Sequence, residues 1–280
     1  GLHSDSELEI NGGNIDISKS YEGIESTDIT INDGNINIVA SDDGLNAAGG
    51  ADGSSTNGRP GQNGMESTTS GTATINGGYI VMDAGGDGLD ANGNLTMTGG
   101  TAIVNGPTNG GNGALDYDGE FNMSGGTLIA AGSLGMVQTP SSSSKLNTIN
   151  VSLTSQEANT LIRIESEDGE DVITFAPTKA YSSVVICTPD IKSNETYKVY
   201  VGGSCSGELK DGLYSGGSYT KGTEVGSCTT SDTITNITQD GASSNSNQPG
   251  EGGGGRGNMS TPPNQSSNSQ STQPNNNSNS

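Results

Sequence analysis

The sequence predicts an all-β protein whose first half is a solenoid of stacked coils. A phrase of alternating apolar and polar residues around a glycine-rich corner occurs five times, beginning at Leu8, Ile29, Ala73, Leu95 and Phe121. The starts at 8, 29, 73, 95 and 121 are separated by 21, 44, 22 and 26 residues, which is one period of about 22 with one insertion. A repeat of this length cannot bury its apolar face alone, so neighbouring copies must stack.

Composition supports the same fold class. The chain has 46 Gly, no Trp, two Phe and 28% hydrophobic residues, which is little apolar mass for a conventional core in 280 residues. A narrow solenoid needs less apolar mass, because each coil packs mainly against its two neighbours.

The repeat also sorts residues into columns, because equivalent positions of successive coils lie above one another at the inter-strand spacing of roughly 4.8 Å. A second phrase between the copies places one apolar residue in each coil: Leu2, Ile24, Leu45, Leu89 and Leu115. We expect this column in the core. The amides of Asn11, Asn32 and Asn76 form another column, which predicts a hydrogen-bonded ladder.

Carboxylates and amides line one corner of the coils. The column after the apolar residue holds His3, Glu25, Asn46, Asp90 and Asp116, whereas Glu22, Asp42, Asp43 and Asp87 lie just before a glycine that we expect to bend the backbone. Stacked like charges repel unless a cation or solvent relieves them. Calcium takes six to eight oxygen ligands at roughly 2.3–2.6 Å and tolerates irregular geometry. The predicted calcium ligands are therefore Glu22, Glu25, Asp42, Asp43, Asn46, Asp87, Asp90 and Asp116; the alternative is an ordinary solvated face.

Charge restricts the partners. The formal net charge is −22, and residues 1–131 contain 18 Asp and Glu against only Lys19 and Arg59. Nucleic acid is a poor partner because phosphate binding depends on Lys and Arg. No stretch approaches the roughly 20 apolar residues of a membrane span, so we expect no membrane insertion. His3 is the only histidine, which argues against a nucleophilic triad. We expect a monomer.

Three segments follow from the change in pattern along the chain. Residues 1–140 are predicted to form the solenoid with a surface loop at 49–71, residues 141–240 a small antiparallel β cap, and residues 241–280 a disordered tail rich in Ser, Asn, Gln, Gly and Pro. Cys187, Cys205 and Cys228 have no metal-binding spacing, and either one disulfide with a free thiol or three buried thiols would fit. The chain begins at Gly1 inside the connecting phrase, without Met or a signal peptide, so we expect that an upstream segment has been removed.

The phrases at 19–25, 41–50 and 211–217 resemble those of the secreted clostridial carbohydrate-binding β-helix proteins, which bind cellulose and acidic sugars and are related to the family 9 polysaccharide lyases. The resemblance covers roughly residues 1–230. It implies a right-handed parallel β-helix with calcium at the acidic corner, an extracellular or cell-surface location, and a pectin-like or cellulosic ligand. In family 9 lyases an Asp-Asp-Gly-x-Asp phrase binds calcium and a lysine abstracts the proton. Here Asn46 ends that phrase, and no lysine lies between Lys19 and Lys145.

The favoured function is therefore a non-catalytic polysaccharide-binding protein, with no catalytic residue assigned. Tyr21, Arg59 and Tyr117 are the candidate ligand-binding residues, although isolated tyrosines are more often packing residues. One alternative is a calcium-dependent lyase acting by β-elimination, with Lys19 or Arg59 as the base. The other alternative is a structural surface adhesin that calcium only stiffens.

Overall fold

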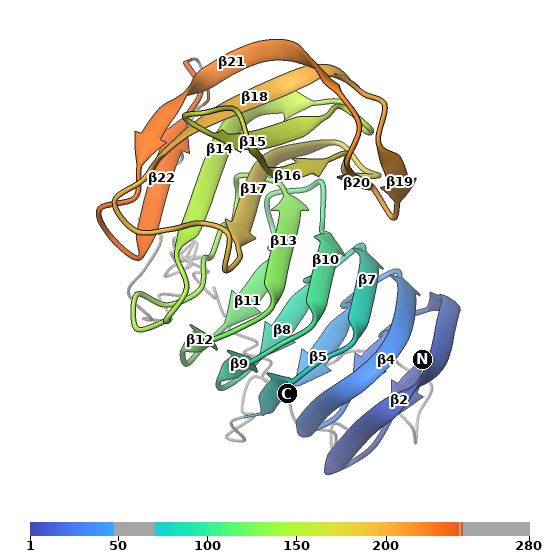
Figure 1. Cartoon of the computed structure of the whole chain (residues 1–280). Helices are drawn as coiled ribbons and strands as arrows, with labels where there is room; N and C mark the ends of the chain where they lie inside the picture. The colour runs from blue at the N-terminus through green and yellow to red at the C-terminus, as the bar shows by residue number, and fades with distance from the viewer. Residues whose placement is uncertain (48–70, 241, 243–280) are drawn as a thin grey trace, which may run out of the picture.

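The structure, a computed structural model, describes residues 1–47, 71–240 and 242. Every regular element in these residues is a β-strand, and the strands form three sheets (Figure 1). The prediction of an all-β fold is confirmed. Arg59, nearly all of the predicted loop at 49–71, and the predicted tail apart from Ala242 lie outside the described residues. The described part of the chain contains no helix long and apolar enough to cross a membrane.

The first sheet consists of five short parallel strands, one from each connecting phrase. They are β1 (Leu2–His3), β3 (Ile24–Glu25), β5 (Leu45–Ala47), β8 (Leu89–Ala91) and β11 (Leu115–Tyr117), adjacent in that order. Their register pairs Leu2 with Ile24, then Leu45, Leu89 and Leu115. The last four of these side chains are at most 1% exposed. The predicted apolar column is therefore confirmed as part of the core.

The second sheet has eleven strands and contains the five repeated phrases. Its strands are β2 (Glu7–Ser20), β4 (Asp28–Ala40), β6 (Thr72–Ile75), β7 (Tyr79–Ala84), β9 (Leu95–Met97), β10 (Thr101–Asn105), β12 (Phe121–Met123), β13 (Thr127–Gly132), β14 (Thr148–Gln156), β17 (Tyr181–Cys187) and β22 (Ile234–Thr238). Successive phrases pair in parallel, from β2 with β4 through to β10 with β13. After β13 the sheet continues with β17, which pairs antiparallel.

Two local features explain the shape of the repeated phrase. Alternation buries one face, as at Ile36 and Ile38, which are 1% and 0% exposed. The corner then requires a positive φ, which Gly78 supplies at 87° and Gly100 at 79°. The predicted amide ladder flanks this corner, because Asn32 Nδ2 donates to Asn11 Oδ1 at 2.7 Å and Asn76 Nδ2 donates to Asn32 Oδ1 at 2.8 Å.

The third sheet is antiparallel and belongs to the C-terminal part of the chain. Its strands are β15 (Ile162–Ser166), β16 (Asp171–Phe175), β18 (Thr196–Cys205), β19 (Glu208–Lys210), β20 (Leu213–Ser215) and β21 (Tyr219–Thr229). The three cysteines are free, and only Cys187 is fully buried.

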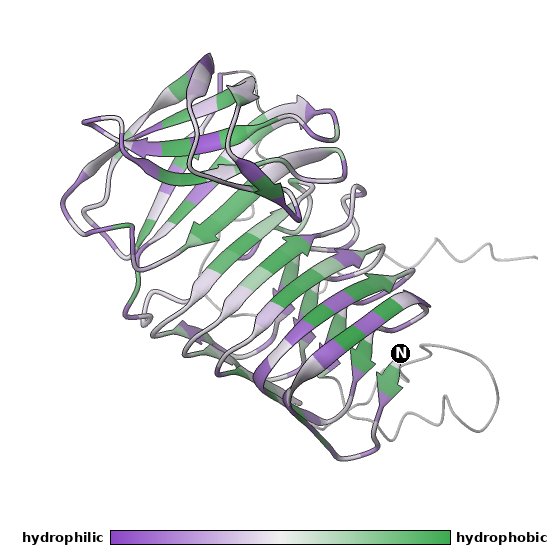
Figure 2. Ribbon diagram, turned by 45° about the vertical axis from the view of Figure 1, so that its right-hand side comes forward, coloured by the Kyte–Doolittle hydropathy of each residue, from purple (hydrophilic) through white to green (hydrophobic). Residues whose placement is uncertain are grey.

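A change of polarity in one outward-facing column marks where this C-terminal part packs. In register along the second sheet the column runs Asp16, Asn37, Val81, Ile103, Ile129. The first two side chains are exposed, whereas Ile103 and Ile129 are fully buried in a core shared with Ile162 and Phe175 of the third sheet. Figure 2 shows the same change, from alternating purple and green in the N-terminal strands to longer green stretches further along the sheet. The outer face is therefore polar where it is bare and apolar where the third sheet covers it.

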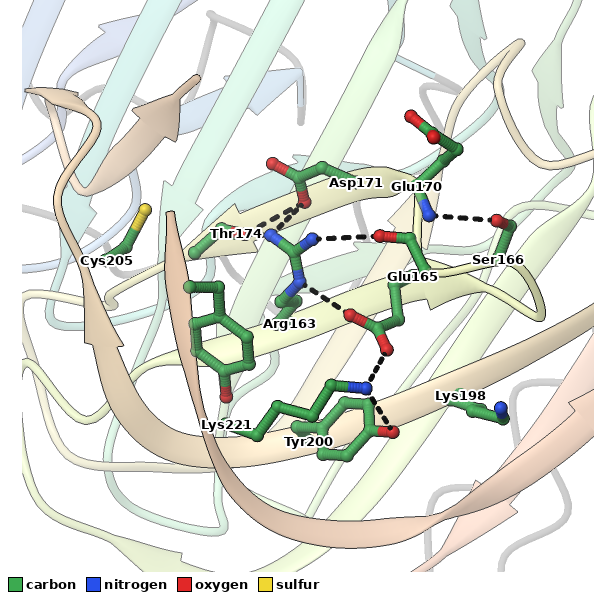
Figure 3. A network of polar contacts seen from close by, with 12 residues as sticks. Arg163, Glu165, Ser166, Glu170, Asp171, Thr174, Lys198, Tyr200, Cys205 and Lys221 are labelled. Atoms are coloured by element: carbon green, nitrogen blue, oxygen red, sulfur yellow. Dashed lines mark hydrogen bonds and ion pairs between the residues drawn. The ribbon is translucent and has the colours of Figure 1, made fainter. Parts of the chain in front are cut away.

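A buried ion-pair network crosses the other face of the third sheet (Figure 3). Glu165 is 3% exposed and receives Arg163 Nε at 3.0 Å and Lys221 Nζ at 2.6 Å. Arg163 also pairs with Asp171 at 3.0 Å and stacks over the ring of Tyr219, 4.9 Å from its centroid. These two cations hold the pKa of Glu165 below its ordinary value against the opposing effect of burial. The network joins β15, β16 and β21.

Replacing Glu165 with Gln should destabilise this sheet by about 2–3 kcal/mol, because Arg163 would stay buried with one carboxylate fewer. Urea unfolding followed by circular dichroism would measure the change. Glu167→Gln is the matched control, since Glu167 is exposed and should change the free energy of unfolding by less than about 0.5 kcal/mol. Equal effects of the two substitutions would contradict the role given to the network.

Candidate functional site

Three of the acidic residues predicted at the corner tie successive repeats together. Glu22 Oε2 accepts the backbone N–H of Asp43 at 3.2 Å, Asp43 Oδ1 accepts that of Asp87 at 2.7 Å, and Asp87 Oδ1 accepts that of Gly113 at 2.6 Å. Each carboxylate thus bonds to the backbone of the following repeat. We call Glu22, Asp43 and Asp87 the linking column.

The glycine after each linking carboxylate allows the repeats to approach closely. A Cβ atom on Gly23 would lie 2.2 Å from the carbonyl oxygen of Gly44, and one on Gly44 would lie 2.7 Å from that of Gly88. Neither glycine has a positive φ in this structure. Gly23 and Gly44 nevertheless lie at bends of the chain, as expected, and the carbonyl group of the next repeat gives a second reason for glycine, because it leaves no room for a side chain.

The second predicted column is brought together in register: His3 pairs with Glu25, Glu25 with Asn46, Asn46 with Asp90, and Asp90 with Asp116. We call these five residues the facing column. The protein supplies a hydrogen-bond donor at each end of it. His3 Nδ1 lies 2.9 Å from Glu25 Oε2, and Gln138 Nε2 donates to Asp116 Oδ1 at 3.3 Å.

The His3 ring also contacts Asp5, with Nε2 at 3.0 Å from the carboxylate. Partial burial lowers the pKa of His3, but the hydrogen bonds with Asp5 and Glu25 outweigh it and raise the pKa overall. The His3 imidazole thus lies between Asp5 and Glu25, the first carboxylate of the facing column.

The middle of the facing column has no such compensation. Asn46 is 5% exposed, and its Oδ1 atom is buried without a hydrogen-bond partner. Across the described residues, no hydrogen-bond donor or cationic side chain contacts the carboxylate of Asp90, its neighbour in register. Buried polar oxygens without partners are rare in folded proteins, and each one calls for an explanation.

Burial and mutual repulsion strongly perturb these carboxyl groups. Burial, followed by the charges of Asp43, Asp116 and Asp87, raises the pKa of Asp90 to about 9. Burial and the nearby Asp43 raise the pKa of Glu22 to about 8. Burial likewise raises the pKa of Asp43 to about 7 and that of Asp87 to about 6, although each accepts a backbone hydrogen bond that acts in the opposite direction. Because the pKa values of Glu22, Asp43 and Asp90 lie at or above 7, the folded corner holds protons at neutral pH that the unfolded chain would release, and this costs stability.

Asp42 and Tyr21 lie at the edge of this corner. The phenol of Tyr21 donates to Asp42, and this hydrogen bond, with burial, raises the pKa of Tyr21 to about 12. The Tyr21 side chain is nevertheless 41% exposed. Its ring is therefore held in place while remaining open to solvent.

The other predicted ligand-binding residues are not part of this corner. Tyr117 donates its hydroxyl to the Thr139 carbonyl at 2.6 Å, and its ring lies edge-on to Phe121 with centroids 6.0 Å apart. These contacts match the packing role that isolated tyrosines usually have. Arg59 lies outside the described residues, and Lys19 is exposed on β2.

The sequence did not point to Lys179. This residue belongs to the C-terminal part of the chain, and its side chain reaches the end of β7, a few residues before Asp87. Its Nζ atom pairs with Asp83 at 3.0 Å. No column or motif in the sequence connects residue 179 with this position, so only the folded chain reveals it.

The donor set at the corner fits calcium in its chemistry. Carboxylate and amide oxygens are the ligands that this hard cation takes, and Asn46 Oδ1 is such an oxygen, buried and unpartnered. Gly86 also leaves space, since a Cβ there would lie 2.4 Å from both Asp42 Oδ1 and Asp43 Oδ1. Within the described ranges, no three His, Cys, Asp or Glu side chains already converge as a ligand set. Binding would therefore require side chains of the two columns to turn toward the ion.

Comparisons with models of protein families, with curated proteins and with solved structures gave no match to this chain. Its function is therefore argued from the corner itself.

Without divalent cations, the melting temperature should fall as the pH rises from about 5 to about 9. The corner carboxyls have folded-state pKa values above the ordinary 3.8 of Asp and 4.5 of Glu, so the folded chain binds more protons than the unfolded one. This stabilisation is complete below the ordinary values and is lost as the pH passes the raised ones.

Thermal unfolding in chelator at several pH values would test this electrostatic effect. Asp90→Asn should make the pH dependence shallower, whereas Asp168→Asn, at an exposed position, should leave it unchanged. The same slope in wild type and Asp90→Asn would show that the burial of Asp90 does not perturb its titration.

Proposed function

We propose that this is a non-catalytic extracellular polysaccharide-binding protein, in which calcium at the acidic corner bridges protein carboxylates to the carboxylates of acidic, pectin-like glycans. We further propose that residues 1–140 are coils of a right-handed parallel β-helix and that the chain is related to the secreted clostridial carbohydrate-binding proteins. The in-register parallel pairing of five successive repeats supports this fold.

The observation that carries the functional proposal is the uncompensated pair in the middle of the facing column. Asn46 Oδ1 is buried without a partner, and Asp90 next to it has the most strongly raised pKa of the corner. The protein's own donors serve the two ends of the column, at Glu25 and Asp116. A bound cation would supply the missing positive charge there and the missing partner of the Asn46 oxygen.

The Asn46–Asp90 pair, with Asp43 and Asp87 of the linking column, would hold the ion. When bound, calcium would neutralise these oxygens and leave coordination positions for a uronate carboxylate. A uronate polymer is otherwise repelled by a chain of net charge −22. The exposed ring of Tyr21, fixed by Asp42, would offer an apolar face to a sugar beside the ion.

We propose a non-catalytic protein because neither Lys179 nor Lys19 is placed to act as a base at the corner. A β-elimination base must be able to accept a proton. The Nζ atom of Lys179 is already engaged by the Asp83 carboxylate at 3.0 Å and by the Ala84 carbonyl oxygen at 2.5 Å, so it is not placed to take a proton from a bound sugar. Lys19 is exposed on β2, outside both columns.

Calorimetric titration with calcium, followed by polygalacturonate in calcium or in chelator, tests the proposal. Wild type should bind calcium, and the polymer should bind only when calcium is present. Asp90→Asn should weaken calcium binding at least tenfold, about 1.4 kcal/mol, because a half-buried carboxylate ligand is replaced by a neutral amide. Asp168→Asn should bind like wild type.

The same variants separate the ion-binding role from a purely structural one. In chelator at pH 8, Asp90→Asn should be more stable than wild type by more than about 1 kcal/mol, because the folded wild type must keep a carboxyl protonated that is ionised in the unfolded chain. Calcium binding without any polymer binding would support the adhesin. Unsaturated product absorbing in the ultraviolet would identify a lyase, and polymer binding unchanged by chelator would rule out the calcium bridge.

A further inference from the structure

A loop of the C-terminal part reaches back to the repeats through Lys179. This residue lies between β16 and β17, and its side chain is 22% exposed. Lys179 Nζ pairs with Asp83 Oδ1 at 3.0 Å and donates to the carbonyl oxygen of Ala84 at 2.5 Å. The preceding backbone N–H, of Thr178, donates to Asn105 Oδ1 at 2.9 Å. The loop is thereby fixed against the ends of β7 and β10.

The residues after Ala84 lead directly into the acidic corner. They are Gly85, Gly86 and Asp87, and Asp87 belongs to the linking column. Gly86 N donates to the Asp42 carbonyl at 2.9 Å, and Asp87 N donates to Asp43 Oδ1 at 2.7 Å. The path of these three residues therefore sets where Asp87 and Asp43 lie relative to each other.

This path is tightly constrained and at the same time intrinsically flexible. A Cβ on Gly85 would lie 2.4 Å from the Ser41 carbonyl, and one on Gly86 would lie 2.4 Å from two carboxylate oxygens, so neither position has room for a side chain. Two consecutive glycines have the greatest backbone freedom to lose on folding. Lys179 donates a hydrogen bond to the carbonyl oxygen of Ala84, the residue immediately before the two glycines. The glycines have no side chains with which to hold this part of the chain themselves.

We infer that Lys179 is a positioning residue for the acidic corner, through which the C-terminal part of the chain sets the affinity of the corner for calcium. This inference rests on the proposed function, since it assumes that the corner binds the ion. Lys179 acts through Ala84 and the two glycines and does not itself contact the ion. The C-terminal β structure then contributes to ligand binding as well as covering the outer face of the repeats.

Coulomb attraction and the positioning role predict opposite effects of removing the Lys179 charge on calcium affinity, so the two can be told apart by experiment. Removing the charge of Lys179 makes the surroundings more negative and releases Asp83 from its ion pair. By Coulomb attraction alone, calcium would then bind more tightly. A loss of position at Asp87 and Asp43 would make it bind more weakly.

Calcium titration of the full chain by calorimetry, with the melting temperature in chelator as a check of folding, compares four proteins. Relative to wild type, Lys179→Met should weaken calcium binding about tenfold, and Lys179→Arg should restore most of the affinity, because a guanidinium can also donate to Ala84 and Asp83. Lys192→Met is the matched control, since the Lys192 ammonium donates to the Pro189 carbonyl within the C-terminal part.

Unchanged or tighter calcium binding in Lys179→Met, with wild type binding normally, would overturn the inference and leave the proposed function intact. Absence of calcium binding in wild type would overturn the proposed function itself. If Lys179→Met does not fold, Lys179→Leu provides the same comparison with a shorter side chain that cannot donate, and wild-type affinity in that variant would equally overturn the inference.

Discussion

The in-register parallel pairing of each repeat with the next is the constraint on which the other features depend. It brings equivalent residues to within roughly 4.8 Å of one another, repeat after repeat. An apolar position becomes a buried column from Ile24 to Leu115, and an amide position becomes the ladder of Asn11, Asn32 and Asn76. Side chains that would have no special role in a single repeat thus form continuous rows along the stacked repeats.

The same pairing makes the acidic corner electrostatically unfavourable at neutral pH. The linking carboxylates offset part of this by accepting backbone N–H groups from the following repeat. Among the described residues, hydrogen-bond partners reach the facing column at its two ends, from His3 and Gln138. The buried, unpartnered Asn46 oxygen beside the half-buried Asp90 is retained at the expense of stability, as happens commonly at functional sites.

The C-terminal part is joined to the repeats by three different contacts. Strand β17 extends the second sheet by antiparallel pairing with β13. The third sheet buries Ile103 and Ile129 on the outer face of the repeats. Lys179 then crosses to Asp83 and Ala84 near the corner. These contacts give the C-terminal part a defined place on the repeats, while the ion pairs around Glu165 act within the third sheet.

The sequence by itself determined the all-β class, the apolar column, the asparagine ladder and the membership of the facing column, because a repeat of fixed period specifies which residues become neighbours. It did not determine what each neighbour does. The linking role of Asp43, the unpartnered oxygen of Asn46 and the packing of Tyr117 depend on side-chain rotamers and burial. The contact of Lys179 with Ala84 joins positions 95 residues apart that share no repeat, so only the tertiary structure could decide it.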